Sequence, residues 1–292
     1  MLVVAVVVGA GVIAGVLVTG AARRWPNLDP GAPHITRRRI RTAVHDHPGL
    51  SGVLARRLDP GAVTGLLLTV TVGLAVGAFV AAGIVLAMIG TERGLQRGDL
   101  PVTRWAAEQT SAGTAEVLAL ISRLGGTGVA VTVGGVVALA GLRRRPGWAM
   151  PVFVLVSIGG QFALVAVIKA LIERARPDLA QLTGFAGASF PSGHAAAAAT
   201  VWAVAALVLT LEPGRRFANV LPGIAVGIAV AVAATRVMLG VHWFTDVVAG
   251  LAVGWGWFAL CSIAFGGRVL HFGEPVQRAE DVAARTHVGA RA

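Results

Sequence analysis

Seven long apolar runs constrain the fold of this chain more than any other feature. They extend roughly over residues 1–20, 62–90, 124–142, 150–172, 194–211, 217–237 and 245–266. Each is about as long as a helix that crosses the hydrocarbon core of a bilayer, roughly 30 Å thick. Backbone inside lipid must satisfy its own hydrogen bonds, so such runs form helices. The sequence therefore predicts an all-α fold, a polytopic membrane bundle of about seven transmembrane helices.

The composition agrees with a membrane protein and excludes a soluble domain. Of the 292 residues, 55% are hydrophobic and only 13% are charged, and the mean hydropathy is +0.76. The single cysteine, Cys261, lies within an apolar run. A disulfide framework or a cysteine metal site is thus excluded, and we expect Cys261 to be buried in the packing.

The N-terminal part of the chain divides into an apolar and a basic segment. Residues 1–20 are predicted to be a transmembrane anchor with its N-terminus outside, because Arg23 and Arg24 follow the run. A cleaved signal peptide is the alternative, but the basic segment that normally precedes its apolar core is missing. We interpret 21–61 as a basic cytoplasmic linker, with a short interfacial helix near 47–58. Its arginines are expected to meet lipid headgroups and not nucleic acid.

The membrane domain itself is predicted to extend over residues 62–266. Between its first two runs, the charged segment 91–123 is typical of a loop followed by an amphipathic helix on the membrane surface. Residues 267–292 form a polar segment without periodicity, which we interpret as a cytoplasmic tail.

The distribution of basic residues tests this topology. With the N-terminus outside and seven alternating spans, 17 of the 25 lysines and arginines lie on the cytoplasmic side and 8 on the outer side. This bias agrees with the positive-inside rule, and it accounts for the net charge of +11 without a nucleic-acid partner. The same topology places three polar motifs together at the outer face.

The third of these motifs joins the last two apolar runs and contains Arg236, His242 and Asp246. If a helix begins near His242, the histidine and Asp246, four residues apart, lie on one helix face. A carboxylate that binds one ring nitrogen fixes the tautomer and leaves the other nitrogen basic. That is the requirement for a histidine that acts as nucleophile or general base.

The first two motifs supply cations and a helix N-terminus. Lys169, the only lysine, and Arg176 are seven residues apart, so we expect both on one face of a helix that Pro177 ends. Taken alone, such charges are equally typical of snorkelling interface residues. Ser192 is expected to cap the next helix, and Gly193 to let the backbone approach an anion bound there. His194 follows one residue later, although a lone histidine is usually a satisfied core residue.

Three cations, two histidines and a helix N-terminus together form a receptor for a tetrahedral phosphate. His242, oriented by Asp246, can attack phosphorus, and His194 can protonate the leaving oxygen. A metal site fits less well, since the nearby cations would oppose it. We therefore expect neither a metal nor another cofactor.

The three motifs, in their order and spacing, resemble the signature of the type 2 phosphatidic acid phosphatases. The matching segments are Lys169 to Pro177, Pro191 to His194, and Arg236 to Asp246. This family shares its core with vanadium haloperoxidases and glucose-6-phosphatase. The resemblance covers about 115–266, and the serine that usually precedes the third-motif arginine is Thr235 here. The implied fold is a six-helix core plus one N-terminal span.

The resemblance implies a phosphohistidine on His242, supported by Asp246, with His194 as the acid. It further implies that five residues hold the phosphate: Lys169, Arg176, Ser192, Gly193 and Arg236. No metal would be required, and vanadate would inhibit.

We accordingly expect a metal-independent lipid phosphate phosphatase of the cell membrane, with an extracytoplasmic active site. Candidate substrates are polyprenyl diphosphate, phosphatidate and phosphatidylglycerophosphate, and an outward site favours the first. A phosphotransferase with the same intermediate remains an alternative. A transporter is disfavoured because charges inside spans, which cost about 2.5–3.5 kcal/mol at the bilayer centre, usually mark a conduction path, and the span interiors here carry none. A haloperoxidase is disfavoured because a site walled by membrane helices suits lipid headgroups.

Overall fold

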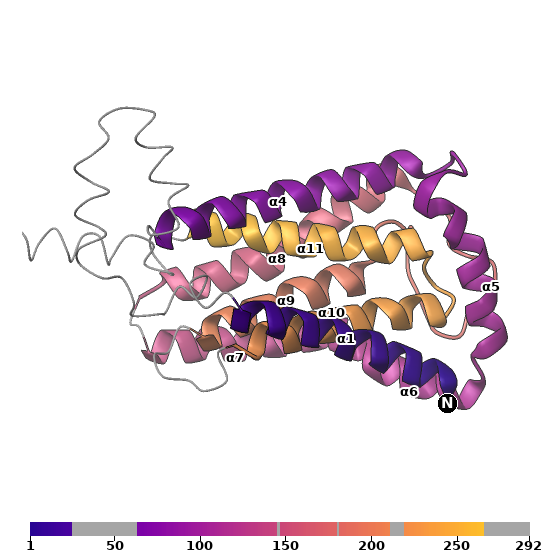
Figure 1. Ribbon diagram of the computed structural model, residues 1–292, viewed down its shortest axis with the longest axis horizontal. Coiled ribbons are helices and arrows are strands. Elements are labelled where there is room, and N and C mark those ends of the chain that lie inside the picture. The colour runs from indigo at the N-terminus through magenta and orange to yellow at the C-terminus, as the bar shows by residue number, and fades with distance from the viewer. Residues whose placement is uncertain (25–62, 145–146, 180, 211–218, 266–292) are drawn as a thin grey trace, which may run out of the picture.

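The structure, a computed structural model, describes residues 1–24, 63–144, 147–179, 181–210 and 219–265. All regular segments within these ranges are helices (Figure 1). The predicted basic linker 21–61, including the expected helix near 47–58, falls almost entirely outside the described residues. So does the predicted tail 267–292. Both domain assignments remain predictions.

Among the described residues, six helices are long and apolar enough to cross a membrane. They are α1 (Leu2–Arg24), α4 (Val63–Met88), α8 (Ala149–Ile172), α9 (Gly193–Thr210), α10 (Leu221–Met238) and α11 (Phe244–Ala264). Helices α6 (Ala112–Ser122) and α7 (Thr127–Arg144) pass the same test together, with a bend of 41° between them, and give a seventh span if the bent pair is counted as one. The predicted all-α membrane bundle is confirmed.

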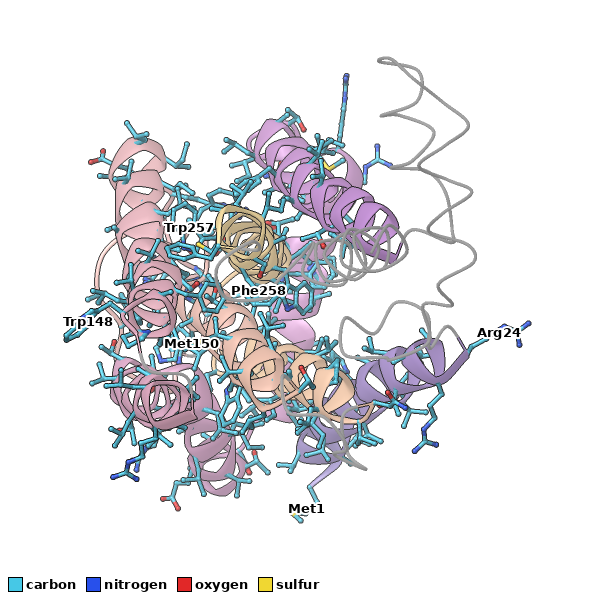
Figure 2. All side chains as sticks on the ribbon, turned by 90° about the vertical axis from the view of Figure 1, so that its left-hand side faces the viewer. Met1, Arg24, Trp148, Met150, Trp257 and Phe258 are labelled. Carbon is cyan, nitrogen blue, oxygen red and sulfur yellow. The ribbon has the colours of Figure 1, made fainter. Side chains whose placement is uncertain are left out.

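Helix α9 lies in the middle of the bundle and positions the site. Its residues from Ala195 to Val201 are all buried, and it contacts α7, α8, α10 and α11. Helix α4 packs outside α11, and α1 packs outside α10. Figure 2 shows this arrangement along the bundle, from the end that carries Arg24 and Trp148. The outer helices expose large apolar side chains, such as Leu17 and Leu155, as expected of surfaces that face lipid.

Two glycines of α11 bring its backbone against α9. A Cβ atom at Gly250 would lie 2.6 Å from the carbonyl oxygen of Ser192, and one at Gly254 would lie 2.5 Å from that of Ala196. Small residues four apart allow helices in membranes to approach this closely. The N-terminal ends of α9 and α11 are therefore held side by side. Cys261 of α11 is buried, as predicted.

The segment 91–123 differs in part from its prediction. It contains a short 3-10 helix, η2 (Gly94–Gly98), then α5 (Asp99–Gln109) and α6. Helix α5 crosses one end of the bundle (Figure 1) and buries a single stripe, Asp99, Thr103 and Ala106. Helix α6 was not expected as a separate element. It is largely apolar, with Glu116 as its one charged residue, and a short 3-10 helix, η3 (Arg123–Gly125), joins it to α7 at the bend.

Candidate active site

The three motifs meet at the end of the bundle that α5 crosses. The loop between α8 and α9, the start of α9 and the turn between α10 and α11 all lie at this end (Figure 1). The loop and the turn are joined by backbone and side-chain hydrogen bonds. Leu182 N donates to the carbonyl of Leu239 at 3.0 Å, and Ser192 N donates to that of Asp246 at 3.0 Å. The site is therefore assembled from segments far apart in the sequence.

His242 and Asp246 are in contact, although the helix begins later than expected. Helix α11 starts at Phe244, so His242 precedes it. The ring Nδ1 of His242 lies 3.4 Å from Asp246 Oδ2, and the same oxygen accepts the backbone N–H of Trp243 at 2.9 Å. Both side chains are buried. The spacing of four residues thus joins them across the first turn of the helix.

Burial lowers the pKa of His242 to about 4. The hydrogen bond to Asp246 and the charge of its carboxylate act in the opposite direction, whereas Arg176 and Arg236 add to the effect of burial. The imidazole is consequently neutral at pH 7. A neutral ring with one nitrogen at a carboxylate has a free lone pair on the other nitrogen, Nε2.

Arg176 reaches His242 from the loop and not from a helix. Helix α8 ends at Ile172 because Glu173 adopts a left-handed conformation with φ 46° and ψ 31°. The prediction that Lys169 and Arg176 share a helix face, with Pro177 ending the helix, was therefore wrong. Arg176 Nη1 nevertheless lies 3.3 Å from His242 Nε2 and donates to the carbonyl of Val241 at 2.5 Å.

Further hydrogen bonds and a ring contact fix the guanidinium of Arg176. It donates to the carbonyls of Ala186, Gly187 and Ala188 at 2.9, 3.0 and 3.2 Å, and it lies 4.7 Å from the ring centre of Phe185. Burial lowers the pKa of Arg176, while the charge of Asp246 opposes this effect. A partly buried cation is thus held against Nε2 of His242.

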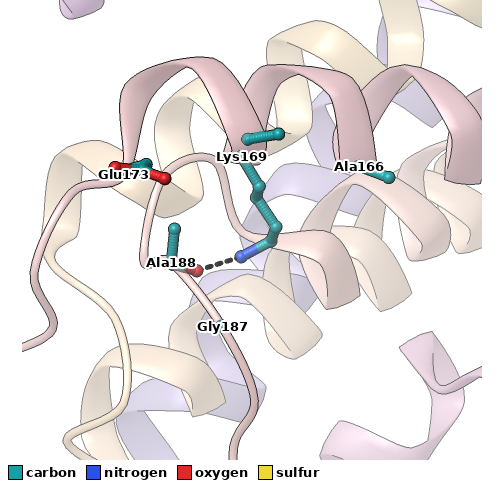
Figure 3. Close-up of a pocket in the computed structure, with 6 residues that line it drawn as sticks. Ala166, Lys169, Glu173, Gly187 and Ala188 are labelled. Atoms are coloured by element: carbon teal, nitrogen blue, oxygen red, sulfur yellow. Dashed lines mark hydrogen bonds between the residues drawn. The ribbon is translucent and has the colours of Figure 1, made fainter.

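Lys169 and Arg236 complete a cluster of cations. Lys169 extends from α8 to the carbonyl of Ala188, as Figure 3 shows. The charges of Arg176 and Arg236 both act on Lys169, so the three cations lie within electrostatic range of one another. Arg236 is buried and donates to Ser122 Oγ at 2.9 Å, but its Nε has no partner among the described residues. Such a cluster is stabilised by a bound anion.

The start of α9 presents polar groups that are free to bind. Ser192 precedes the helix, but its buried hydroxyl has no hydrogen-bond partner within the described ranges, so the expected capping bond is not made. A Cβ at Gly193 would meet nothing closer than 3.8 Å. The N–H groups of the first helical turn lack partners within the helix. His194, the second residue of α9, is influenced by the charges of His242 and all three cations.

Sequence reasoning missed three residues that organise the site: Arg174, Asp99 and Ser189. Arg174 donates to Asp246 Oδ1 at 2.5 Å and to Asp99 Oδ2 at 2.7 Å. Asp99 is buried on α5, far from the motifs in the sequence. Arg174 lies two residues before Arg176, and in extended chain such residues project to the same side. That spacing was the one signal in the sequence; nothing local indicated Asp99. Ser189 donates to Asp246 Oδ2.

The comparison with known proteins identifies the family. The PAP2 superfamily matches residues 151–269, a range that contains all three motifs. The chain is 35% identical over 144 residues to phosphatidylglycerophosphatase B of Bacillus subtilis. The aligned region covers 48% of this chain and 69% of that protein. The chain belongs to the PAP2 superfamily. The resemblance drawn from the motifs is thereby confirmed, and this PAP2 protein is a phosphatase.

Other relatives agree with this assignment. A lipid A 1-phosphatase of Rhizobium etli is 41% identical over 107 residues, covering 33% of this chain and 42% of the relative. A decaprenylphosphoryl-5-phosphoribose phosphatase of Mycobacterium tuberculosis is 35% identical over 138 residues, covering 45% and 68%. The crystal structure of a transmembrane PAP2 type phosphatidylglycerolphosphate phosphatase from Bacillus subtilis superposes with a TM-score of 0.58 at 28% identity. The superposed region covers 68% of this PAP2 protein and 96% of the chain in that crystal structure.

Proposed function

We propose that this PAP2 phosphatase hydrolyses the phosphate or diphosphate headgroup of a membrane lipid through a phosphohistidine on His242. The observation that carries the proposal is the placement of the His242 ring. Its Nδ1 faces Asp246 and its Nε2 faces the guanidinium of Arg176, 3.3 Å away. A nucleophilic nitrogen beside a cation whose charge attracts phosphate is an arrangement that favours attack on phosphorus.

The remaining cations and the start of α9 would hold the other phosphate oxygens. Lys169, Arg236, the hydroxyl of Ser192 and the backbone N–H at Gly193 are the proposed partners. In support, Ser192 Oγ and Arg236 Nε are buried polar atoms without a partner among the described residues. Leaving such atoms unpaired costs about 1–3 kcal/mol each, and an anion that binds both offsets this cost. Three cations also disperse the charge that develops during phosphoryl transfer.

His194 is the proposed acid. In the first step, His242 Nε2 forms a bond to phosphorus and the phosphorus–oxygen bond to the lipid breaks. His194 gives its proton to the departing oxygen, which leaves as an alcohol or a monophosphate. In the second step, His194 takes a proton from water, whose oxygen attacks phosphorus, and inorganic phosphate leaves His242. A divalent metal is not part of this scheme, because the groups that face the phosphate already supply positive charge.

The pocket beside Lys169 supports a lipid substrate. It is an open pocket of about 510 Å³, lined by Ala166 and Ala170 of α8 together with Lys169, Glu173, Gly187 and Ala188 (Figure 3). The two alanines lie on the exposed side of α8, where the surrounding surface is apolar. We therefore propose that the lipid chain lies along α8 while its headgroup reaches Lys169. The relatives named above act on lipid phosphates, which makes phosphatidylglycerophosphate the first substrate to test.

The test is phosphate release by the purified protein in detergent and EDTA. The panel comprises phosphatidylglycerophosphate, phosphatidate, polyprenyl diphosphate and decaprenylphosphoryl-5-phosphoribose. We expect release from at least one lipid, no release by His242→Ala or His194→Ala, and full release by His34→Ala, which replaces a histidine outside the three motifs. Brief reaction with a ³²P-labelled lipid should also give a protein-bound phosphate that survives alkali and is lost in acid, as a phosphohistidine is.

Each other outcome has a defined meaning. Full activity of His242→Ala would contradict the proposed nucleophile, and strict dependence on a divalent metal would contradict the mechanism. Consumption of the lipid without inorganic phosphate would favour the alternative, transfer of the phosphoryl group to an acceptor other than water.

A further inference from the structure

A continuous chain of buried charges extends behind His242. Arg174 bridges two carboxylates, with Nη1 at 2.5 Å from Asp246 Oδ1 and Nη2 at 2.7 Å from Asp99 Oδ2. The exposed fractions of the side chains are 10% for Arg174, 6% for Asp99 and 0% for Asp246. Asp246 in turn contacts His242. Screening by water is weak at such depth, so a change at one end of the chain is felt at the other.

Asp99 also fixes the start of α11. Its Oδ1 accepts the backbone N–H of Thr245 at 2.9 Å, and its Oδ2 accepts the Thr245 hydroxyl at 2.8 Å. It therefore satisfies a free donor in the first turn of α11 from a different helix, α5. Arg174 adds a hydrogen bond of 2.8 Å to the same hydroxyl, and its guanidinium lies 5.5 Å from the ring centre of Trp243. The turn that carries His242 is clamped on both sides.

We propose that Arg174 and Asp99 are positioning residues, which orient Asp246 and set how strongly it holds the His242 ring. This inference rests on the proposed role of His242 as nucleophile. Neither residue contacts His242, and neither is expected to touch the phosphate. They act through the carboxylate between them and the ring. A guanidinium suits this role because its planar fork binds two acceptors at once, in fixed directions.

The two residues have opposite effects on the charge of the site. The positive charge of Arg174 partly neutralises the carboxylate of Asp246 and so weakens the attraction between that carboxylate and a protonated His242. Asp99 partly neutralises Arg174 and so restores that attraction. Loss of Arg174 should therefore raise the pKa of His242, and loss of the Asp99 charge should lower it. A bracing role alone predicts no such opposition.

Other charged groups also lie near His242, and none of them is altered in the variants of Arg174 and Asp99 proposed below. They come from α8, the loop after it, α9 and α10: Lys169, Arg176, His194 and Arg236. Because the variants below leave these groups unchanged, a difference between their pH profiles reports on Arg174 and Asp99. The titration of the substrate is common to all variants and cancels.

The experiment compares Arg174→Gln, Arg174→Lys and Asp99→Asn with the unaltered protein. In each, kcat and KM are measured from pH 3.5 to 8, and the folded fraction is followed by size-exclusion chromatography and Tm. For Arg174→Gln we expect a fall in kcat of about 10- to 100-fold, the range found when partners that orient metal-binding histidines are removed. KM should change little, since the phosphate contacts remain. The acid limb of kcat/KM should move to higher pH for Arg174→Gln and to lower pH for Asp99→Asn. Arg174→Lys, which keeps the charge, should bring the limb back.

Controls separate this inference from the proposed function. Arg104→Gln and Glu108→Gln remove exposed charges on α5 and should leave the pH profile unchanged. If Arg174→Gln does not fold, Asp99→Asn and Arg174→Lys can still be compared. The acid limb should lie at lower pH in Asp99→Asn than in Arg174→Lys. Limbs that move together, or not at all, would overturn the positioning role and leave only a structural brace. Activity in His242→Ala would instead overturn the proposed nucleophile itself.

Discussion

The carboxylate of Asp246 accepts hydrogen bonds from four groups, and this sharing decides the state of His242. Arg174 occupies Oδ1, while Ser189, the backbone N–H of Trp243 and the His242 ring all approach Oδ2. A carboxylate with so many donors is fixed in orientation and remains ionised. It can hold the ring of His242 in one tautomer without removing its proton.

The pH dependence of the reaction should reflect the burial of His242. Protonation removes the lone pair of Nε2, so activity is lost as pH falls through the pKa of this group. Because burial lowers that pKa from its usual value near 6.5 to about 4, kcat/KM should still be high at pH 5 and fall below it. The profile is measured with phosphatidate after correction for the second ionisation of the substrate, followed by ³¹P NMR. An enzyme-derived limb near pH 6.5 would contradict the burial argument.

Spacing in the sequence could predict some residues of the site but not others. His242 and Asp246 are four residues apart, and Ser192, Gly193 and His194 are consecutive, so local geometry determines how they are placed. Asp99 is 75 residues before Arg174, and its role depends on α5 crossing the end of the bundle. The early end of α8 was also beyond reach, because Glu173 is not a residue that normally adopts positive φ.

Among the helices, the close packing of α9 against α11 determines the geometry of the candidate active site. A Cβ at Gly250 would lie 2.6 Å from the carbonyl oxygen of Ser192, which stands two residues before His194. The N–H of Ser192 donates to the carbonyl of Asp246 in the first turn of α11. The backbones are so close that a single methyl group would have to displace one helix. The distance between the start of α9 and His242 is therefore determined by the absence of side chains at Gly250 and Gly254.

Replacing Gly250 by alanine tests this coupling. A Cβ 2.6 Å from a backbone oxygen cannot be accommodated without moving a helix, and we expect kcat to fall by about 10-fold or more, since displacements near 1 Å in an active site cost up to about 100-fold. Gly135→Ala on α7 is the matched control, because a Cβ there meets nothing within 4 Å. Equal activity and equal Tm for the two variants would show that α9 and α11 can separate without consequence.

For the molecule as a whole, the two ends of the bundle carry different features. The site, α5 and Met1 lie at one end, and Arg23, Arg24 and Trp148 lie at the other (Figures 1 and 2). The seven predicted spans place the basic linker at the latter end and the site at the outer face. The family assignment does not test this orientation, so it stays a prediction.

Cysteine labelling of intact cells tests the orientation. In a Cys261→Ala background, Leu182→Cys places a thiol at the site end and Trp148→Cys places one at the opposite end; the native side chains are 37% and 77% exposed. A membrane-impermeant maleimide should label Leu182→Cys on intact cells and Trp148→Cys only after permeabilisation. The reverse pattern would place the active site in the cytoplasm.

The order in which Asp99, Arg174 and Asp246 are synthesised has a consequence for biogenesis. A ribosome makes Asp99 first, Arg174 75 residues later and Asp246 72 residues after that. Asp99 is thus made before its partner Arg174 exists, Arg174 before Asp246, and the proposed nucleophile arrives with the last span that the structure describes. A chain whose insertion is interrupted before α11 lacks both His242 and the carboxylate that orients it. With His242 as the proposed nucleophile, we expect catalytic competence to coincide with the synthesis of α11, so that unfinished chains do not hydrolyse lipids.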